Sequence, residues 1–199
     1  MSSNNMGDIT LMKDDALIIV DMQKDFLSGG KLAVPEGDKI IPAINRYIEA
    51  VRLKGMRVFA TRDWHPSGHS SFQDQGGPWP AHCVTDTEGA QFADDLRLPA
   101  DALIISTGTA VEKDGYSGFD GTDLDEQLRS VGISRLYIGG LATDYCVLNT
   151  VKDAIKLGYR VILLQDCIRA VNVNPDDGEK ALEEMIRHGA VPVRWEMIG

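Results

Sequence analysis

Short apolar runs alternate with longer segments of helical period along most of the chain. The apolar runs are rich in β-branched residues or solidly apolar, as strands buried on both faces are. They cover residues 16–20, 57–61, 102–106, 135–139, 160–164 and 191–194. Helical periodicity covers residues 38–53, 123–130, 144–157 and 175–188. This alternation predicts an α/β fold, a three-layer α/β/α sandwich around a mainly parallel sheet of about six strands.

The pattern also predicts how the chain is divided. Residues 1–15 are polar and are expected to form a flexible N-terminal tail, followed by a single domain over residues 16–199. No apolar run approaches the ~18 residues of a membrane span, and no signal-peptide pattern is visible. The three cysteines are too few and too scattered for a disulfide framework. They fit a reducing compartment, so we expect a cytoplasmic protein.

The net charge narrows the choice of partners. The formal charge is −10 over 199 residues, while the hydrophobic share of 43% is ordinary for a globular protein. An acidic surface argues against nucleic acid or an anionic membrane as the main partner. It leaves a small-molecule ligand in a local pocket as the expected partner.

A candidate nucleophile follows the fourth predicted strand. The run from Gly139 to Cys146 reads GGLATDYC, and Thr143 stands where a helix N-cap is expected. Cys146 then falls near the third helical position, where the helix dipole favours a thiolate and backbone amides can hold an oxyanion. The alternative is that Cys146 is a small buried residue that packs the helix on the sheet.

Other polar residues follow neighbouring strands. Ligands of parallel α/β sheets bind at the carboxyl ends of the strands, so Asp21, Asp63, His65 and Cys146 are expected to converge there. Asp21 ends an apolar strand, and partial burial should raise its pKa toward that of a useful base. Taken alone, Asp21 fits a helix cap or an ion-pair anchor slightly better than a base.

One loop region carries a possible metal site. Asp63, His65, His69 and His82 lie within about 20 residues of one another, and imidazole with carboxylate suits Zn, Mn or Fe. The alternative is loop histidines that make ordinary hydrogen bonds.

Aromatic residues are spread over the same loops, and they suit a pocket for a planar ring or, equally, the packing of the loops on the body. They are Phe26, Trp64, Phe72, Trp79, Tyr116 and Phe119. Trp79, fixed between glycines and prolines, is the best candidate for a pocket wall.

Five motifs in order carry a resemblance that spans about residues 16–194. They are VDMQKDF (20–26), TRDWHP (61–66), GGPWPAHC (76–83), YSGF (116–119) and GLATDYCV (140–147). With these motifs the chain resembles the nicotinamidases of the isochorismatase-like cysteine hydrolase superfamily. The resemblance implies the isochorismatase-like hydrolase fold and assembly into a homo-oligomer.

The resemblance also implies an activity. A metal-dependent cysteine amidohydrolase of this kind converts nicotinamide to nicotinate and ammonia, as in NAD salvage. Cys146 would attack the carboxamide to form a thioester, which water then hydrolyses, and Asp21 would be the general base. The Leu141–Ala142 peptide matches a position that is cis in the family, and the amides of Ala142 and Cys146 match its oxyanion hole.

The remaining roles are implied in the same way. Asp63, His65 and His82 would hold the divalent metal ion, Zn or else Mn or Fe, and His69 is a further candidate because some relatives use a His in that loop. The ring of the substrate would lie in a pocket lined by Phe26, Trp79 and Tyr116.

One position departs from the family pattern. The catalytic Lys of the family precedes a Gly at the end of the third strand, and Thr107 stands there in this chain. A hydroxyl brings no positive charge, so thiol attack should slow unless Lys113, Lys24 or Arg62 substitutes. Two alternatives therefore stay open: a related hydrolase of another amide or carbamoyl compound, and a catalytically impaired homologue that only binds metal and ligand.

Overall fold

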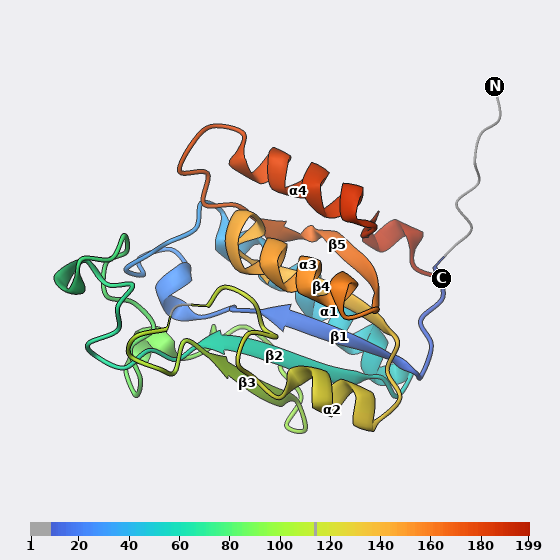
Figure 1. Cartoon of the computed structure of the whole chain (residues 1–199). Helices are drawn as coiled ribbons and strands as arrows, with labels where there is room; N and C mark the ends of the chain where they lie inside the picture. Colours follow the sequence, from blue (N-terminus) through green and yellow to red (C-terminus); the bar gives the residue numbers. More distant parts are fainter. Residues whose placement is uncertain (1–8, 114) are drawn as a thin grey trace.

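The computed structural model describes residues 9–113 and 115–199, and a parallel sheet forms its centre (Figure 1). Six strands pair in the order β3-β2-β1-β4-β5-β6, each in parallel with its neighbour. They are β1 (Asp15–Val20), β2 (Arg57–Asp63), β3 (Leu103–Thr107), β4 (Arg135–Leu141), β5 (Arg160–Arg169) and β6 (Val191–Val193). Strand order reverses between β1 and β4, and such a switch point opens a crevice at the carboxyl ends of the strands.

The two faces of the sheet are buried in separate cores. Leu17 and Ile19 of β1 face a core shared with α1 (Ile41–Leu53). Ala16, Ile18 and Val20 face the opposite core. That core is shared with α2 (Leu124–Ser130), α3 (Leu148–Lys156) and α4 (Asp177–His188). Helices therefore cover both faces, which confirms the predicted three-layer α/β/α sandwich (Figure 1).

The predicted elements are present, with shifted ends. The segment predicted as a helix over residues 38–53 begins with a short 3-10 turn, Gly37–Ile40, before α1. β5 continues to Arg169, beyond the predicted end at residue 164, because β4 pairs with it again after an irregularity between Ile138 and Gly140. Gln165 and Asp166 interrupt the apolar run there, so the pattern of the sequence hides the extension.

The first described residues pack on the body of the protein. Ile9 forms a bridge with Ile198, and Leu11 is buried, so residues of the expected tail contact the domain. Residues 1–8 of the expected tail lie outside the described residues. Across the described ranges, no helix is both long and apolar enough to cross a membrane.

The long segment after β2 is held in place by backbone pairing. Bridges join His65 to Val84 and Phe72 to Trp79, and the amide of Ser70 donates to the carbonyl of Val111. This segment, drawn in green, projects from the end of the sheet at which β1 and β2 finish (Figure 1). It therefore lies beside the crevice that the strand order creates.

Candidate active site

Three buried side chains meet at the carboxyl ends of the central strands. Asp21 follows β1, Asp63 ends β2, and Cys146 lies in the turn after β4. One ligand atom from each lies within 4.8 Å of the others. Since β1 lies between β2 and β4 in the sheet, the order of the strands brings these residues together.

The turn that carries Cys146 differs from the predicted helix start. Residues Thr143–Val147 form a π-helical turn whose N-cap is Ala142, and no side chain caps it, so the prediction that Thr143 is the N-cap is wrong. The Leu141–Ala142 peptide bond is cis. Just before it, Gly140 has a φ of 133° and lies so close to the backbone of Val20 that a Cβ would clash. Only glycine suits this position.

The environment of Cys146 favours the thiol over the thiolate. Burial, followed by the negative charges of Asp21 and Asp63, raises the pKa of Cys146 well above its usual value. The sequence predicts the opposite, because it gives the helix position and the convergence of the carboxylates but not how close they lie to the buried sulfur. Cys146 therefore needs a base that removes its proton as it attacks.

Asp21 is placed to be that base. Its carboxylate accepts a hydrogen bond of 2.6 Å from the Thr61 hydroxyl and also contacts the Cys146 thiol. Burial, followed by the charge of Asp63, raises the pKa of Asp21 to about 7. The expected rise in pKa is present, and a group that titrates near neutrality suits general-base catalysis at that pH.

Two histidines direct one ring nitrogen each toward Asp63. Nδ1 of His65 lies 3.0 Å from the Gly108 carbonyl, and Nδ1 of His82 lies 2.7 Å from the Pro80 carbonyl. A carbonyl only accepts, so both Nδ1 atoms donate. The Nε2 atoms then face Asp63 Oδ2, at 3.4 Å from His65 and 3.7 Å from His82. Backbone carbonyls fix metal-binding histidines in this way.

Asp63, His65 and His82 form a donor set that fits a divalent metal ion. All three are buried, and one ligand atom from each lies within 4.8 Å of the others. Burial opposes the ionisation of Asp63, but the close approach of the His65 and His82 imidazoles outweighs it and holds the pKa of this carboxyl well below its usual range. Two imidazoles and a carboxylate suit Zn, Mn or Fe.

His69 lies beside this donor set but not within it. Its ring stacks on that of His65, with the centroids 4.2 Å apart. Nδ1 lies 2.8 Å from the Ser71 hydroxyl and also accepts from the Ser71 amide, while Nε2 lies 3.2 Å from the Lys113 carbonyl. These contacts fix the His69 ring as a neighbour of the candidate ligands.

Two polar residues that sequence reasoning did not single out hold the ligand loops. The Gln23 side chain accepts from the Asp63 amide at 2.8 Å and donates to the Asp63 carbonyl at 2.7 Å. Asp25 accepts a hydrogen bond of 2.7 Å from the amide of Cys83, the residue after His82. Both follow β1 within the same motif as Asp21, which is the signal that could have found them.

An apolar pocket opens over Cys146. Phe26, Trp79 and Tyr116 line it, together with Ala142 and Tyr145. Leu32, Val34 and Val171 complete its apolar wall. Sequence reasoning missed Tyr145, although it lies next to the candidate nucleophile, and it missed the three aliphatic residues, whose loops carry no distinctive pattern.

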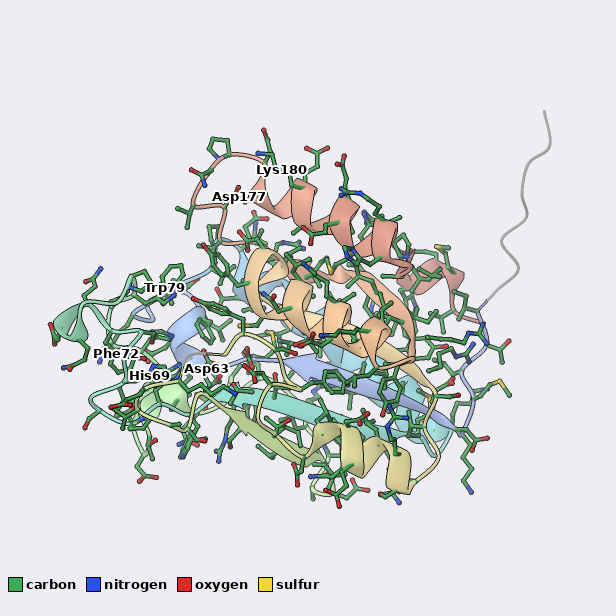
Figure 2. The ribbon with its side chains drawn as sticks, in the orientation of Figure 1. Asp63, His69, Phe72, Trp79, Asp177 and Lys180 are labelled. Carbon is green, nitrogen blue, oxygen red and sulfur yellow. The ribbon has the colours of Figure 1, made fainter. Side chains whose placement is uncertain are left out.

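Trp79 is held in place by its aromatic neighbours. Its indole nitrogen donates to the Tyr116 hydroxyl at 3.0 Å, and its ring meets Tyr145 edge-on at 5.2 Å. Figure 2 shows Trp79, Phe72 and His69 on the loops at the end of the sheet where Asp63 lies. Phe72 contacts the rings of the candidate ligands instead of lining the pocket.

The position that departs from the family pattern has its own partners. The Thr107 hydroxyl lies 3.0 Å from Asp63 Oδ1 and 3.1 Å from the Arg62 carbonyl. The three cations considered as substitutes for a lysine there are engaged elsewhere. Lys113 pairs with Asp120 at 2.7 Å, Lys24 with Asp94 at 2.9 Å, and Arg62 lies over the Trp64 ring at 3.6 Å.

Comparison with known proteins places this architecture in one family. Residues 15–197 match the isochorismatase domain. A nicotinamidase of Escherichia coli (strain K12) is 42% identical over 200 residues, which cover 90% of this chain and 94% of that protein.

Two crystal structures are similar over nearly their whole length. The pyrazinamidase of Pyrococcus horikoshii in complex with zinc is 53% identical with a TM-score of 0.88, over 92% of this chain and 99% of that one. PnC1 from L. infantum in complex with nicotinate is 36% identical with a TM-score of 0.89, over 96% of this chain and 98% of that one.

Proposed function

Because this chain belongs to the isochorismatase domain family, we propose that it converts nicotinamide to nicotinate and ammonia. It is a hydrolase that acts on a C–N amide bond outside peptides, as its nicotinamidase relatives indicate. The observation that carries the proposed substrate is a hydrogen-bonded Cys146–Asp21 pair below an aromatic pocket, beside the donor set of Asp63, His65 and His82.

The first half of the reaction uses the Cys146–Asp21 pair. Asp21 takes the thiol proton as Sγ bonds to the carboxamide carbon, so the sulfur need not be a thiolate beforehand. The C–N bond then breaks, and the proton on Asp21 passes to the leaving nitrogen, which departs as ammonia. The product is a thioester between Cys146 and the nicotinoyl group. Ala142 and Cys146 lie in the turn that would offer backbone amides to the oxyanion.

The second half returns the enzyme to its starting state. Asp21 takes a proton from water as the water oxygen attacks the thioester carbonyl. The C–S bond breaks as the proton on Asp21 passes to the Cys146 sulfur, and the product leaves as nicotinate after its remaining proton is released to solvent. A single carboxyl group that titrates near pH 7 can serve both half-reactions as acid and base.

The pocket fits a flat heteroaromatic amide. Trp79, Tyr116 and Tyr145 contact one another across three loops, so their positions are set before a ligand binds. Preformed aromatic walls can stack a pyridine ring with little loss of side-chain freedom. A divalent ion held by Asp63, His65 and His82 would add positive charge and a bond to the ring nitrogen.

Ammonia release from nicotinamide tests the proposal. The zinc-loaded protein should release ammonia and nicotinate in equal amounts, and Cys146→Ala should abolish this release. Rapid quenching should trap a nicotinoyl adduct on Cys146, detectable by mass spectrometry. Tight nicotinamide binding without ammonia release would contradict the proposed reaction and indicate an impaired, ligand-binding homologue.

A further inference from the structure

We propose that Thr107 is a positioning residue of the metal centre, where its hydroxyl fixes the orientation of the Asp63 carboxylate, and that it is not a partner of Cys146. The inference rests on the donor set of the proposed function but not on the identity of the substrate. It assigns Thr107 a task different from the one its place in the family pattern implies.

The two oxygens of Asp63 have different surroundings. Oδ2 faces Nε2 of His65 and Nε2 of His82, at 3.4 and 3.7 Å. Oδ1 lies 3.0 Å from the Thr107 hydroxyl. A hydrogen bond on one oxygen leaves the other for an ion, so Thr107 determines which carboxylate oxygen joins the two imidazoles.

The Thr107 proton has two acceptors within reach, the Asp63 carboxylate at 3.0 Å and the Arg62 carbonyl at 3.1 Å. A hydroxyl donates only one hydrogen. An ionised carboxylate is a stronger acceptor than an amide carbonyl, and hydrogen bonds to charged groups are about twice as strong. The proton therefore goes to Asp63.

The pairing of β2 with β3 places Thr107 beside Asp63. Asp63 and Thr107 are register partners in the parallel β2–β3 pair, and the Trp64 amide donates to the Thr107 carbonyl at 3.0 Å. The next residue, Gly108, accepts from His65 Nδ1 at 3.0 Å. Consecutive residues at the end of β3 thus hold two of the three candidate ligands.

Gly108 shows how tightly this arrangement is built. It has a φ of 59°, and a Cβ on it would overlap the His65 ring. Glycine is therefore required for the close approach of the two. The Thr107–Gly108 pair supports the candidate ligands much as outer-shell groups support the ligands of known metal sites.

Zinc affinity measured without substrate tests the role of Thr107. Wild type, Thr107→Val, Thr107→Ala and Thr107→Ser are titrated against a chromogenic chelator. Losing a group that hydrogen-bonds a metal ligand costs about 10–100-fold in metal affinity, so the Val and Ala variants should bind zinc more weakly by that factor. Ser keeps the hydroxyl and should stay within about threefold of wild type. Urea unfolding of the metal-free variants identifies any that fail to fold.

Ser106→Ala is the matched control. It removes a hydroxyl one position earlier on β3 that accepts from Arg62 at 2.9 Å, and it should leave zinc affinity unchanged. Equal zinc affinity in wild type and in folded Val and Ala variants would overturn the inference. Because no substrate is present, absent ammonia release would overturn the proposed function while leaving this result intact.

Discussion

Thr61 and Asp21 form a buried pair in which the threonine hydroxyl donates to the carboxylate across 2.6 Å. Thr61 lies on β2 and Asp21 follows β1, so neighbouring strands set the distance between them. The hydrogen bond lowers the pKa of Asp21, and burial with the charge of Asp63 raises it further than the hydrogen bond lowers it. The candidate base is thus oriented without being fully stabilised as an anion.

Thr61→Val should lower kcat by about 10–100-fold, because hydrogen bonds to charged groups contribute about 1.5–3 kcal/mol. KM should change little, since Thr61 is absent from the pocket lining. Thr61→Ser should restore most of kcat because it keeps the hydroxyl. Steady-state kinetics of the three proteins decide this. A Val variant with wild-type kcat would contradict the role given to the hydrogen bond.

Asp21→Asn should stabilise the metal-free protein above neutral pH. The unfolded Asp titrates near 3.8 and the folded one near 7, so the native state keeps a proton that the unfolded state releases between these values. Wild-type stability therefore falls as pH rises from about 4 to 7 by about 2–4 kcal/mol at this site. Asn cannot ionise and does not incur this loss.

Urea unfolding of chelator-treated wild type and Asp21→Asn at pH 4.5 and pH 8 measures the effect. The two proteins should have similar unfolding free energies at the lower pH, and the variant should be more stable at the higher pH while losing catalysis. A stability difference that does not grow with pH would contradict the raised pKa of Asp21.

Metal removal should lower both activity and thermal stability. A ligand that binds only the folded state raises the unfolding free energy, by about 4 kcal/mol at a thousandfold excess over Kd. Chelation should therefore lower Tm, and zinc should restore it. His82→Ala should remove the response, whereas Lys180→Gln, at an exposed position of α4 (Figure 2), should retain it. A zinc-induced rise in Tm in His82→Ala would contradict the donor set.

Thr107→Lys should make Cys146 more reactive. An ammonium near Asp21 and Asp63 would offset the negative charge that raises the pKa of the thiol. Each unit by which the thiol pKa falls gives about tenfold more thiolate at pH 7. Alkylation by iodoacetamide should therefore be at least about tenfold faster. Cys83 and Cys167 are fully buried, so labelling of Cys146 can be followed by mass spectrometry.

Thr109→Lys is the control for the Thr107→Lys experiment, because it adds the same charge at an exposed position two residues later. It should leave the alkylation rate near that of wild type. Equal rates in both variants would contradict an electrostatic cause.

The sheet and the convergence of its polar ends were predictable because both depend on local patterns. Solid apolar runs give buried parallel strands, and Asp21, Asp63 and Cys146 follow three of them. The reactivity of Cys146 was not predictable. Its position in a helical turn favours a thiolate, but burial and two carboxylates from strands far away in the sequence reverse the preference. How close these carboxylates lie to the sulfur is set only when the chain folds.

The hydrogen-bond partner of Thr107 was also not predictable from the sequence. The family pattern links this position to the nucleophile, whereas the β2–β3 register pairs it with Asp63. The same limit applies to Gln23, which binds a residue 40 positions away, and to Val171, which lines the pocket. Neither role leaves a local pattern in the sequence.

The most direct test of the proposed reaction is the release of ammonia from nicotinamide by the zinc-loaded protein, with Cys146→Ala as the control. Wild type should release ammonia and nicotinate in equal amounts, and the variant should release none above background. No release from zinc-loaded wild type, or equal release from both proteins, would contradict it.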